Sequence, residues 1–212
     1  ALVRKLYPDG IHAAIAKAFD GDKDISVEMV TLDMPEHGLT EKLLAETDTL
    51  VWWGHVRHND VSDEIAERVR KRVWEGMGLV VLHSGHYSKP FRLLMGTPCD
   101  VTLWNEDGEK ERIVVVAPEH PIAAGLDRVF EIGVEESYAE PMEIPNPLEL
   151  IMISWFEHGE VFRSACTYKR GRGRIFYFRP GHETFPTYYH SQVRRVIANG
   201  ARWVANRAIA SS

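Results

Sequence analysis

Two short apolar runs with an amphipathic segment between them constrain the fold of this chain most strongly. Residues 49–53, TLVWW, and residues 79–82, LVVL, are uninterrupted apolar runs of strand length, which are typical of parallel strands covered on both faces. After Ser62, a residue type that caps helices, apolar residues recur every four positions: Ile65, Val69, Val73 and Met77. A strand, a helix and a strand in this order predict a βαβ unit in a parallel sheet.

The same alternation continues along the chain. We expect further helices at residues 11–19, 40–46, 90–95 and 189–208, and further strands at 26–32, 113–117, 150–155, 161–168 and 174–178. The last three strands are closely spaced, and the turns between them predict antiparallel hairpins. Residues 119–147 are rich in proline, so we expect a long excursion without regular structure. The prediction is one α/β domain over residues 1–212, with a doubly wound, mostly parallel sheet and an antiparallel hairpin extension.

Composition argues against several classes of function. The chain has 25 basic and 31 acidic side chains, and its basic cluster at residues 169–174 indicates a hairpin turn, so we expect no nucleic-acid partner. No apolar run approaches the roughly 18 residues that span a bilayer, and no signal peptide is visible. The only cysteines, Cys99 and Cys166, cannot build a disulfide framework. We therefore expect no membrane partner and a cytoplasmic location.

Histidines gather where three of the predicted strands end. The motifs are GHVRH at residues 54–58, HSGH at 83–86 and GHE at 181–183. The carboxyl ends of parallel strands meet at one edge of a sheet, and ligands bind there. Neutral imidazoles near a carboxylate suit Zn²⁺ or a related divalent ion, and they equally suit acid–base chemistry near neutral pH. No spacing matches a standard zinc signature, so the argument rests on convergence.

Other polar residues extend this candidate site, and each also has a structural interpretation. Arg179 could bind a substrate or form a structural ion pair. Glu136 and Tyr138 lie in the expected excursion, which could be a lid or a solvated acidic loop. Ser84 invites a serine-hydrolase interpretation, but the sequence supplies no specific orienting acid. The histidines themselves could cap helices or bond to the backbone.

Several short motifs occur together in an order that a known family shares. They are WWGH with His58, HSGH, His120-Pro121-Ile122 with Gly125, EESY at residues 135–138 and RPGHE at 179–183. In these motifs, from about Leu50 to the final helix, the chain resembles the ThuA-like, trehalose-utilisation family. The resemblance implies a flavodoxin-like sheet of the class I glutamine amidotransferase-like type and a role in carbohydrate metabolism.

The resemblance implies two departures from related proteins. Class I amidotransferases carry a nucleophilic cysteine at an elbow after a central strand, and His83 occupies the matching place here. Cys99 and Cys166 stand at no such elbow, so we expect neither glutaminase nor cysteine-peptidase chemistry. Relatives also begin with a strand and a polar loop, whereas this chain opens in a helix, so we expect a chain shortened at its N-terminus.

Two functions remain open from the sequence. The first is a metal-assisted isomerase or hydrolase of a sugar or keto-sugar, since no Gly-x-Gly-x-x-Gly turn for a dinucleotide occurs. Its predicted metal ligands, for zinc first, are His86, His182 and one of His55 and His58, its catalytic residues are Glu183, Glu136 and His83, and its substrate-binding residues are Arg179, Tyr138 and Ser84. The second is a non-catalytic carbohydrate-binding or regulatory protein with the same pocket. Strands within residues 161–178 could pair two copies of the chain in a homo-oligomer.

Overall fold

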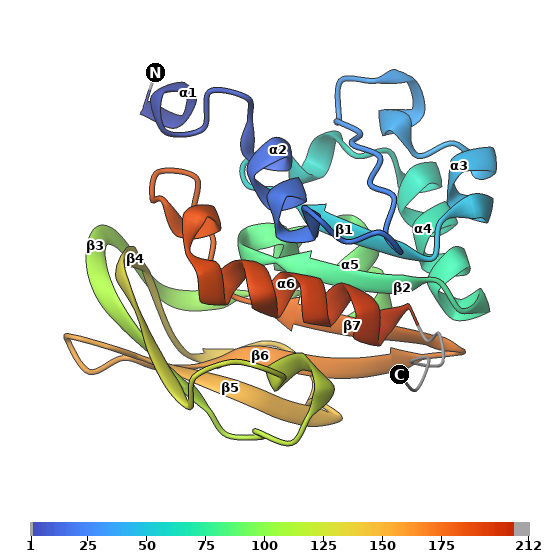
Figure 1. Cartoon of the computed structure of the whole chain (residues 1–212). Coiled ribbons are helices and arrows are strands. Elements are labelled where there is room, and N and C mark those ends of the chain that lie inside the picture. Colours follow the sequence, from blue (N-terminus) through green and yellow to red (C-terminus); the bar gives the residue numbers. More distant parts are fainter. Residues whose placement is uncertain (1, 206–212) are drawn as a thin grey trace.

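One seven-stranded sheet runs through the described chain, residues 2–205, in the computed structural model (Figure 1). The strand order is β1-β2-β7-β6-β5-β3-β4. The strands are β1 Thr49–Trp53, β2 Gly78–Leu82, β3 Val101–Val115, β4 Val129–Met142, β5 Glu149–Phe156, β6 Val161–Arg170 and β7 Gly173–Phe178. The α-helices are α1 Leu2–Leu6, α2 Ile11–Ala16, α3 Glu41–Glu46, α4 Asp63–Glu75, α5 Lys89–Met95 and α6 Ser191–Val204. None of the helices in this part of the chain is both long and apolar enough to cross a membrane.

The predicted βαβ unit is present and forms the parallel half of the sheet. β2 pairs in parallel with β1 on one side and β7 on the other, with Leu82 opposite both Trp53 and Phe178. The three carboxyl ends therefore lie level at one edge. The Ser62 hydroxyl accepts a hydrogen bond from the Ile65 N–H and so caps α4, as the sequence predicts.

Helices cover both faces of this parallel half. The apolar side of α4 packs with α5 against alternate residues of the strands, such as Val81 and Tyr177. α2 and α6 pack against the other set, such as Val80 and Phe176 (Figure 1). Each fully buried aliphatic or aromatic side chain contributes about 1.5–3 kcal/mol, so the two layers hold the strand ends rigidly in place.

The rest of the sheet is antiparallel, which corrects the sequence prediction. Four of the six neighbouring strand pairs in the described chain are antiparallel: β7–β6, β6–β5, β5–β3 and β3–β4. A doubly wound, mostly parallel sheet is therefore not confirmed. The error lies in residues 119–147, where β4 replaces the expected irregular excursion, and in β3, which begins at Val101 rather than at residue 113. Phe130 and Ile132 are buried between exposed neighbours, so β4 carries an alternating pattern that the flanking prolines concealed.

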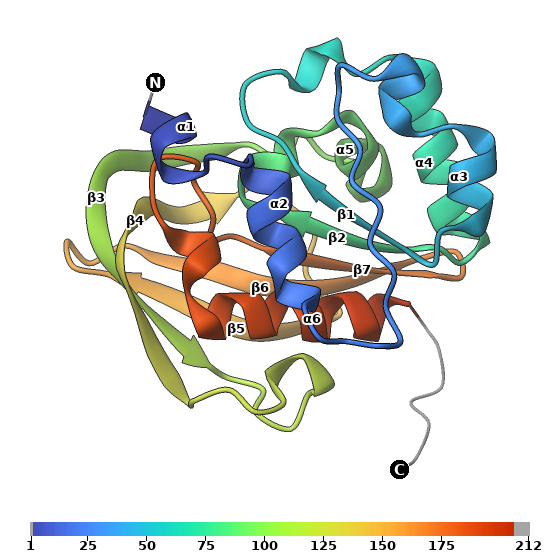
Figure 2. The ribbon, with the colours of Figure 1, turned by 45° about the horizontal axis from the view of Figure 1, so that its top comes forward.

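The long strands β3 and β4 curl back over the sheet. β4 is the edge strand, yet Glu140 on it accepts hydrogen bonds from the N–H and Nε of Arg163 on β6, at 3.1 and 2.7 Å. The turned view in Figure 2 shows the arch of β3 and β4 on the side of the molecule away from α3 and α4. This curl returns residues 135–138 to the neighbourhood of β7.

Three further expectations differ from the structure. Residues 26–32, expected as a strand, form no strand and pair with none, although Val30 and Leu32 pack against the core beneath α4. The expected helix over residues 11–19 is α2 followed by a 3-10 turn, Lys17–Phe19. The final helix begins at Ser191 rather than at residue 189, and residues 206–208 of its expected span lie outside the described chain.

Candidate functional site

The loops that follow β1, β2 and β7 bring three histidines into contact. His55 follows β1, His83 begins a 3-10 turn after β2, and His182 lies four residues beyond β7. The ring centroid of His182 lies 4.9 Å from the ring centroid of His55 and 5.3 Å from that of His83. The ring centroids of His55 and His83 lie 6.2 Å apart. The edge at which the parallel strands end therefore carries a compact imidazole cluster.

Unusual backbone conformations shape the two loops that hold this cluster. His83 has φ 52°, in the left-handed region that side chains other than glycine seldom adopt. Such strain costs on the order of 1–3 kcal/mol and concentrates at functional sites. Gly181 has φ 133°, and a Cβ there would lie 2.0 Å from the Tyr188 hydroxyl, so only glycine fits. Both loops therefore contain a backbone conformation that few residue types adopt.

His83 and Glu136 present two hydrogen-bond acceptors to each other. His83 Nδ1 lies 3.0 Å from the Arg179 carbonyl oxygen, and a carbonyl only accepts, so Nδ1 carries the proton and Nε2 keeps its lone pair. That Nε2 lies 3.0 Å from Glu136 Oε2, and neither atom has a hydrogen-bond partner. Burial lowers the pKa of His83 to about 4 and raises the pKa of Glu136 to about 7. A proton or a cation must lie between the two atoms.

His182 Nε2 is the third unpartnered atom at this point. It is buried, and His182, His83 and Glu136 each offer one ligand atom within 4.8 Å of the other two. Burial, assisted by His83, lowers the pKa of His182, which favours the neutral ring. Its Nδ1 lies 2.8 Å from Thr184 Oγ1, a hydroxyl that can accept the Nδ1 proton and leave Nε2 free, although the Thr184 N–H at 3.3 Å favours the other tautomer. Two imidazole nitrogens and one carboxylate thus converge.

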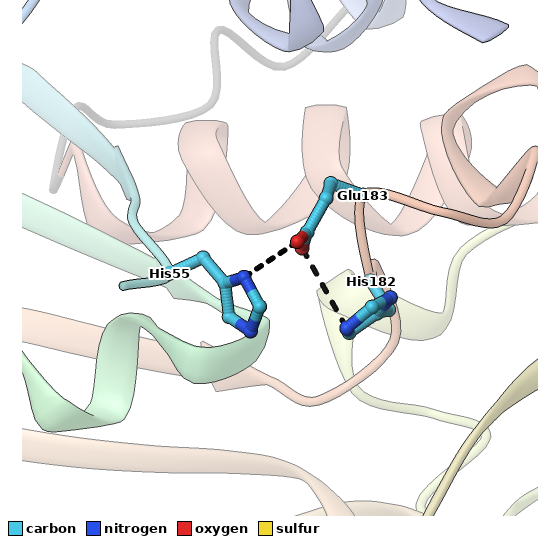
Figure 3. A group of neighbouring side chains, drawn as sticks. All are labelled: His55, His182 and Glu183. Carbon is cyan, nitrogen blue, oxygen red and sulfur yellow. Dashed lines mark ion pairs between the residues drawn. The ribbon is translucent and has the colours of Figure 1, made fainter. Parts of the chain in front are cut away.

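His55 and Glu183 form a second, more accessible pair beside this trio. His55 Nδ1 lies 2.6 Å from Glu183 Oε1, and their side chains are 23% and 16% exposed. Figure 3 shows Glu183 between His55 and His182, and its Oε2 lies 3.7 Å from His182 Nε2. The hydrogen bond that His55 donates to the Glu183 carboxylate raises the pKa of His55 against the effect of burial. Burial would raise the pKa of Glu183, but the bond with His55 and other contacts lower it. An imidazole held by a carboxylate is suited to proton transfer.

His58 and His86 stand apart from the cluster. Among the described residues, neither belongs to a group of three or more ligand atoms within 4.8 Å of one another. His86 Nδ1 lies 2.8 Å from the Cys99 carbonyl oxygen, and its ring packs 4.0 Å from that of Tyr87. The ring centroid of His58 lies 6.0 Å from that of Tyr87. Burial lowers the pKa of His58 to about 4. Of the four predicted metal ligands, the structure brings together His55 and His182.

The predicted substrate-binding residues are engaged within the protein. Arg179 is 0% exposed, forms an ion pair with Glu111 and donates from Nη1 to the Glu136 carbonyl oxygen at 2.6 Å. The Ser84 hydroxyl donates to the Gly54 carbonyl oxygen at 2.8 Å. Tyr138 is 4% exposed, and burial raises its pKa. These contacts indicate support for the cluster rather than exposure to solvent.

Of three further acidic residues around the cluster, sequence reasoning missed Glu111 and Glu106, and it named Glu135 without choosing it as a site residue. Glu111 on β3 pairs with Arg179, and Glu135 on β4 is fully buried against the loop after β7. Glu106 Oε1, from β3, lies 3.5 Å from His182 Nε2 and is 48% exposed at the mouth of the cluster. Only Glu135 carried a signal, its place in the EESY motif, because no local pattern indicates the curl that brings β3 and β4 here.

The hollow of about 410 Å³ found on the surface lies elsewhere. It is lined by Glu119, His120, Glu149 and their neighbours, and by no residue of the imidazole cluster. His120 Nδ1 accepts a hydrogen bond from the Ile122 N–H, so the HPI motif has a structural role as a cap. The cluster itself is nearly closed, and His55, Glu183 and Glu106 are its accessible members.

Comparisons with known proteins assign the chain to a family. The chain matches the family model ThuA, described as trehalose utilisation, over residues 3–204. No curated protein matches the chain.

Solved structures share the fold at low identity. A ThuA-like protein from Parabacteroides merdae is 15% identical, with a TM-score of 0.70 over 95% of this chain and 86% of that chain. A ThuA-like protein from Bacteroides uniformis is 14% identical, with a TM-score of 0.72 over 96% and 86%. The cytoplasmic protein STM1381 from Salmonella typhimurium is 13% identical, with a TM-score of 0.64 over 91% and 86%. At these identities the likeness concerns the fold alone.

Proposed function

Because the chain belongs to the ThuA, or trehalose utilisation, family, we propose that it is a metal-assisted enzyme acting on a sugar or keto-sugar. The reaction takes place at the edge where β1, β2 and β7 end. One observation carries the proposal: His83, His182 and Glu136 each offer a ligand atom within 4.8 Å of the other two, and His83 Nε2, His182 Nε2 and Glu136 Oε2 are buried without hydrogen-bond partners. Buried polar atoms are nearly always satisfied, so three that face the same point favour a ligand between them.

The donor set fits a divalent ion such as zinc. Catalytic zinc sites use three nitrogen or oxygen ligands from the protein and leave a position open. The Arg179 carbonyl fixes the His83 tautomer that ligation requires. At His182 the Thr184 hydroxyl supports the same tautomer, at the expense of the bond from the Thr184 N–H. When bound, the ion would supply Lewis acidity for a sugar carbonyl or hydroxyl. This assignment keeps His182 as a ligand and adds His83 and Glu136.

His55 and Glu183 serve as the proton-transfer pair in this proposal. Glu183 holds His55 Nδ1, so the opposite ring nitrogen is free to give or take a proton. Both side chains are partly exposed, which lets a substrate reach them. Proton transfer beside a polarised carbonyl or hydroxyl suits an isomerase or a hydrolase of a sugar derivative. Cys99 and Cys166 are buried and burial raises the pKa of each thiol, so neither supports glutaminase chemistry.

Zinc titration of variants tests the proposal. Protein purified without a metal-affinity tag should bind about one zinc per chain, measured by elemental analysis after dialysis. His83→Ala and His182→Ala should each weaken zinc affinity at least about 100-fold in competition with a chelator. His86→Ala is the matched control, a buried histidine outside the group, and should leave the affinity unchanged.

Activity on oxidised disaccharides, followed by NMR of the products, completes the test. Activity should fall on zinc removal and return on zinc addition. Metal-free protein that binds sugars with unchanged affinity in His83→Ala would instead establish the alternative, a non-catalytic carbohydrate-binding protein. Loss of zinc from His86→Ala with retention in His83→Ala would overturn the ligand assignment.

Location and assembly form part of the same proposal. The Salmonella neighbours are named cytoplasmic proteins, and we extend a cytoplasmic location to this chain, which cell fractionation would check. The half-exposed Trp155 on β5 and Val161 on β6 lie opposite each other in the sheet. They offer a surface for a homo-oligomer, which light scattering would detect as a mass above 24.2 kDa.

A further inference from the structure

Glu135 is a buried carboxylate surrounded by hydrogen-bond donors. Its side chain is fully buried on β4. Oε2 accepts hydrogen bonds from the Gly181 N–H at 2.9 Å and the Thr187 hydroxyl at 2.6 Å. Oε1 accepts from the His182 N–H at 3.2 Å and from the Glu136 N–H at 2.9 Å. One carboxylate thus satisfies four donors.

These donors belong to the two segments that carry the imidazole and carboxylate cluster. Gly181 and His182 lie in the loop after β7, whereas Glu136 lies on β4, the strand at the far edge of the sheet. The contacts between Glu135 and the loop span 46 and 47 residues of sequence. The Thr187 hydroxyl also reaches Glu135 across this junction, and Arg179 Nη1 donates to the Glu136 carbonyl oxygen beside it. The carboxylate therefore joins the parallel and antiparallel halves of the sheet at the cluster.

We propose that Glu135 is a positioning residue that holds His182 and Glu136 at the separation at which both can bind one metal ion. It contacts neither the ion nor the substrate. This inference rests on the proposed function, because the separation matters for activity only if the two side chains act together.

A glutamate is required at this place by the chemistry of the four donors. A carboxylate offers only acceptors, whereas a glutamine amide replaces one oxygen by an NH₂ group that donates. If the amide nitrogen takes the place of Oε2, the Thr187 hydroxyl can rotate and accept from it. The Gly181 N–H can only donate, so it then faces another donor. If it takes the place of Oε1, it faces the N–H groups of His182 and Glu136. Either way a buried N–H meets another donor, so the loop must move although the side chain keeps its size.

Glu135→Gln, compared with Glu140→Gln, tests the proposal. Glu140 lies on the same strand and pairs with Arg163, so its variant loses a carboxylate without touching the loop after β7. Zinc affinity, measured by chelator competition, should fall about 10–100-fold in Glu135→Gln, as for other residues that orient metal ligands. It should change less than about threefold in Glu140→Gln. Hydrogen exchange of residues 181–187 should accelerate only in Glu135→Gln.

Three outcomes would overturn the positioning role. Unchanged zinc affinity and exchange in Glu135→Gln would show that the loop does not depend on this carboxylate. Equal loss of zinc affinity in Glu140→Gln would show general loosening of β4. Lost affinity with unchanged exchange would make Glu135 a ligand. Thr187→Val, which removes one donor only, provides a milder variant if Glu135→Gln fails to fold, and its zinc affinity should fall by a smaller factor.

Failure of the proposed function gives a different result. If the wild-type protein binds no zinc at all, the metal-assisted reaction is refuted. Faster exchange of residues 181–187 in Glu135→Gln, measured without metal, would then still establish the tie between β4 and the loop.

Discussion

Replacing Arg179 with methionine should destabilise the protein by about 3 kcal/mol at pH 7, through the carboxylate that it leaves behind. Arg179 and Glu111 are both 0% exposed and form an ion pair, and Glu111 otherwise accepts only from the Ser154 hydroxyl. Burial raises the pKa of Glu111, and the Arg179 guanidinium opposes that effect. Methionine has a similar length and no charge, so it leaves burial unopposed. Glu111 should then take up a proton on folding rather than remain charged.

The cost of that proton uptake gives the magnitude. The ordinary pKa of a glutamate is 4.5, and each pH unit above it costs about 1.36 kcal/mol to hold the group neutral. At pH 7 the cost is about 3.4 kcal/mol, which is the upper limit of the difference from wild type because the pKa of Glu111 is already raised there, and it compares with the 3–5 kcal/mol typical when one member of a buried pair is removed. For a chain of this length, a loss of about 3.4 kcal/mol lowers Tm by about 7–14 °C.

Urea unfolding of Arg179→Met at pH 5, 6 and 7 measures this effect. In the variant, the folded pKa of Glu111 lies above its unfolded value, so the folded state binds more protons between about pH 4.5 and 7. The deficit relative to wild type should therefore shrink by about 1.36 kcal/mol for each pH unit lowered. The double variant Arg179→Met/Glu111→Gln should lack this pH dependence. A deficit that is constant with pH, or a double variant as unstable as the single one at pH 7, would refute the reasoning.

Three further predictions concern the loop, the curl and the first βαβ unit. Gly181→Ala should cost about 1–3 kcal/mol from its φ of 133° alone, and the close approach of the new Cβ to the Tyr188 hydroxyl adds to this cost. Thermal unfolding should show a lower Tm, and an unchanged Tm would contradict both reasons. Glu140→Gln should cost about 1–2 kcal/mol, because bonds from Arg163 lower the pKa of Glu140 against burial. Its difference from wild type in urea should begin to shrink as pH falls below about 4.5 and go on shrinking through the lowered folded pKa, and a difference that does not shrink with pH would exclude the ion pair as its cause. Ser62→Ala should cost about 1 kcal/mol through the lost cap of α4, which denaturant titration can detect.

The parallel half of this fold was predictable from local pattern. Residues 49–53 and 79–82 become β1 and β2 because continuous apolar runs have no solvent-facing side and need cover on both faces. Parallel pairing then places their carboxyl ends level, so the meeting of His55, His83 and His182 follows from topology. Helix α4 likewise follows from its cap and its four-residue repeat.

The antiparallel half and the second part of the site were not predictable in this way. In β4 the buried residues alternate only at its start, and the acidic residues Glu135 and Glu136 are buried as well. Acidic side chains in a sequence usually indicate exposure to solvent, so this strand has no clear local pattern. Arg179 points inward because it pairs with buried Glu111, which lies 68 residues earlier in the chain. No spacing or local composition reports such distant charge pairing. The sequence therefore indicated the loops of the site, with Glu136 and Glu183, but not Glu111 and Glu106, which the curl of β3 brings to it.

The distance along the chain between the parts of the cluster also bears on its synthesis. The His83 ring bonds to Arg179 across 96 residues, and the Trp53 indole bonds to Gly181 across 128. At about 5–20 residues per second, a ribosome needs roughly 2–9 s to add the residues between Glu136 and His182. During that time the nascent chain carries β4 without the loop that Glu135 holds. A translation product that stops before residue 182 lacks His182 and Glu183, so it cannot complete the cluster.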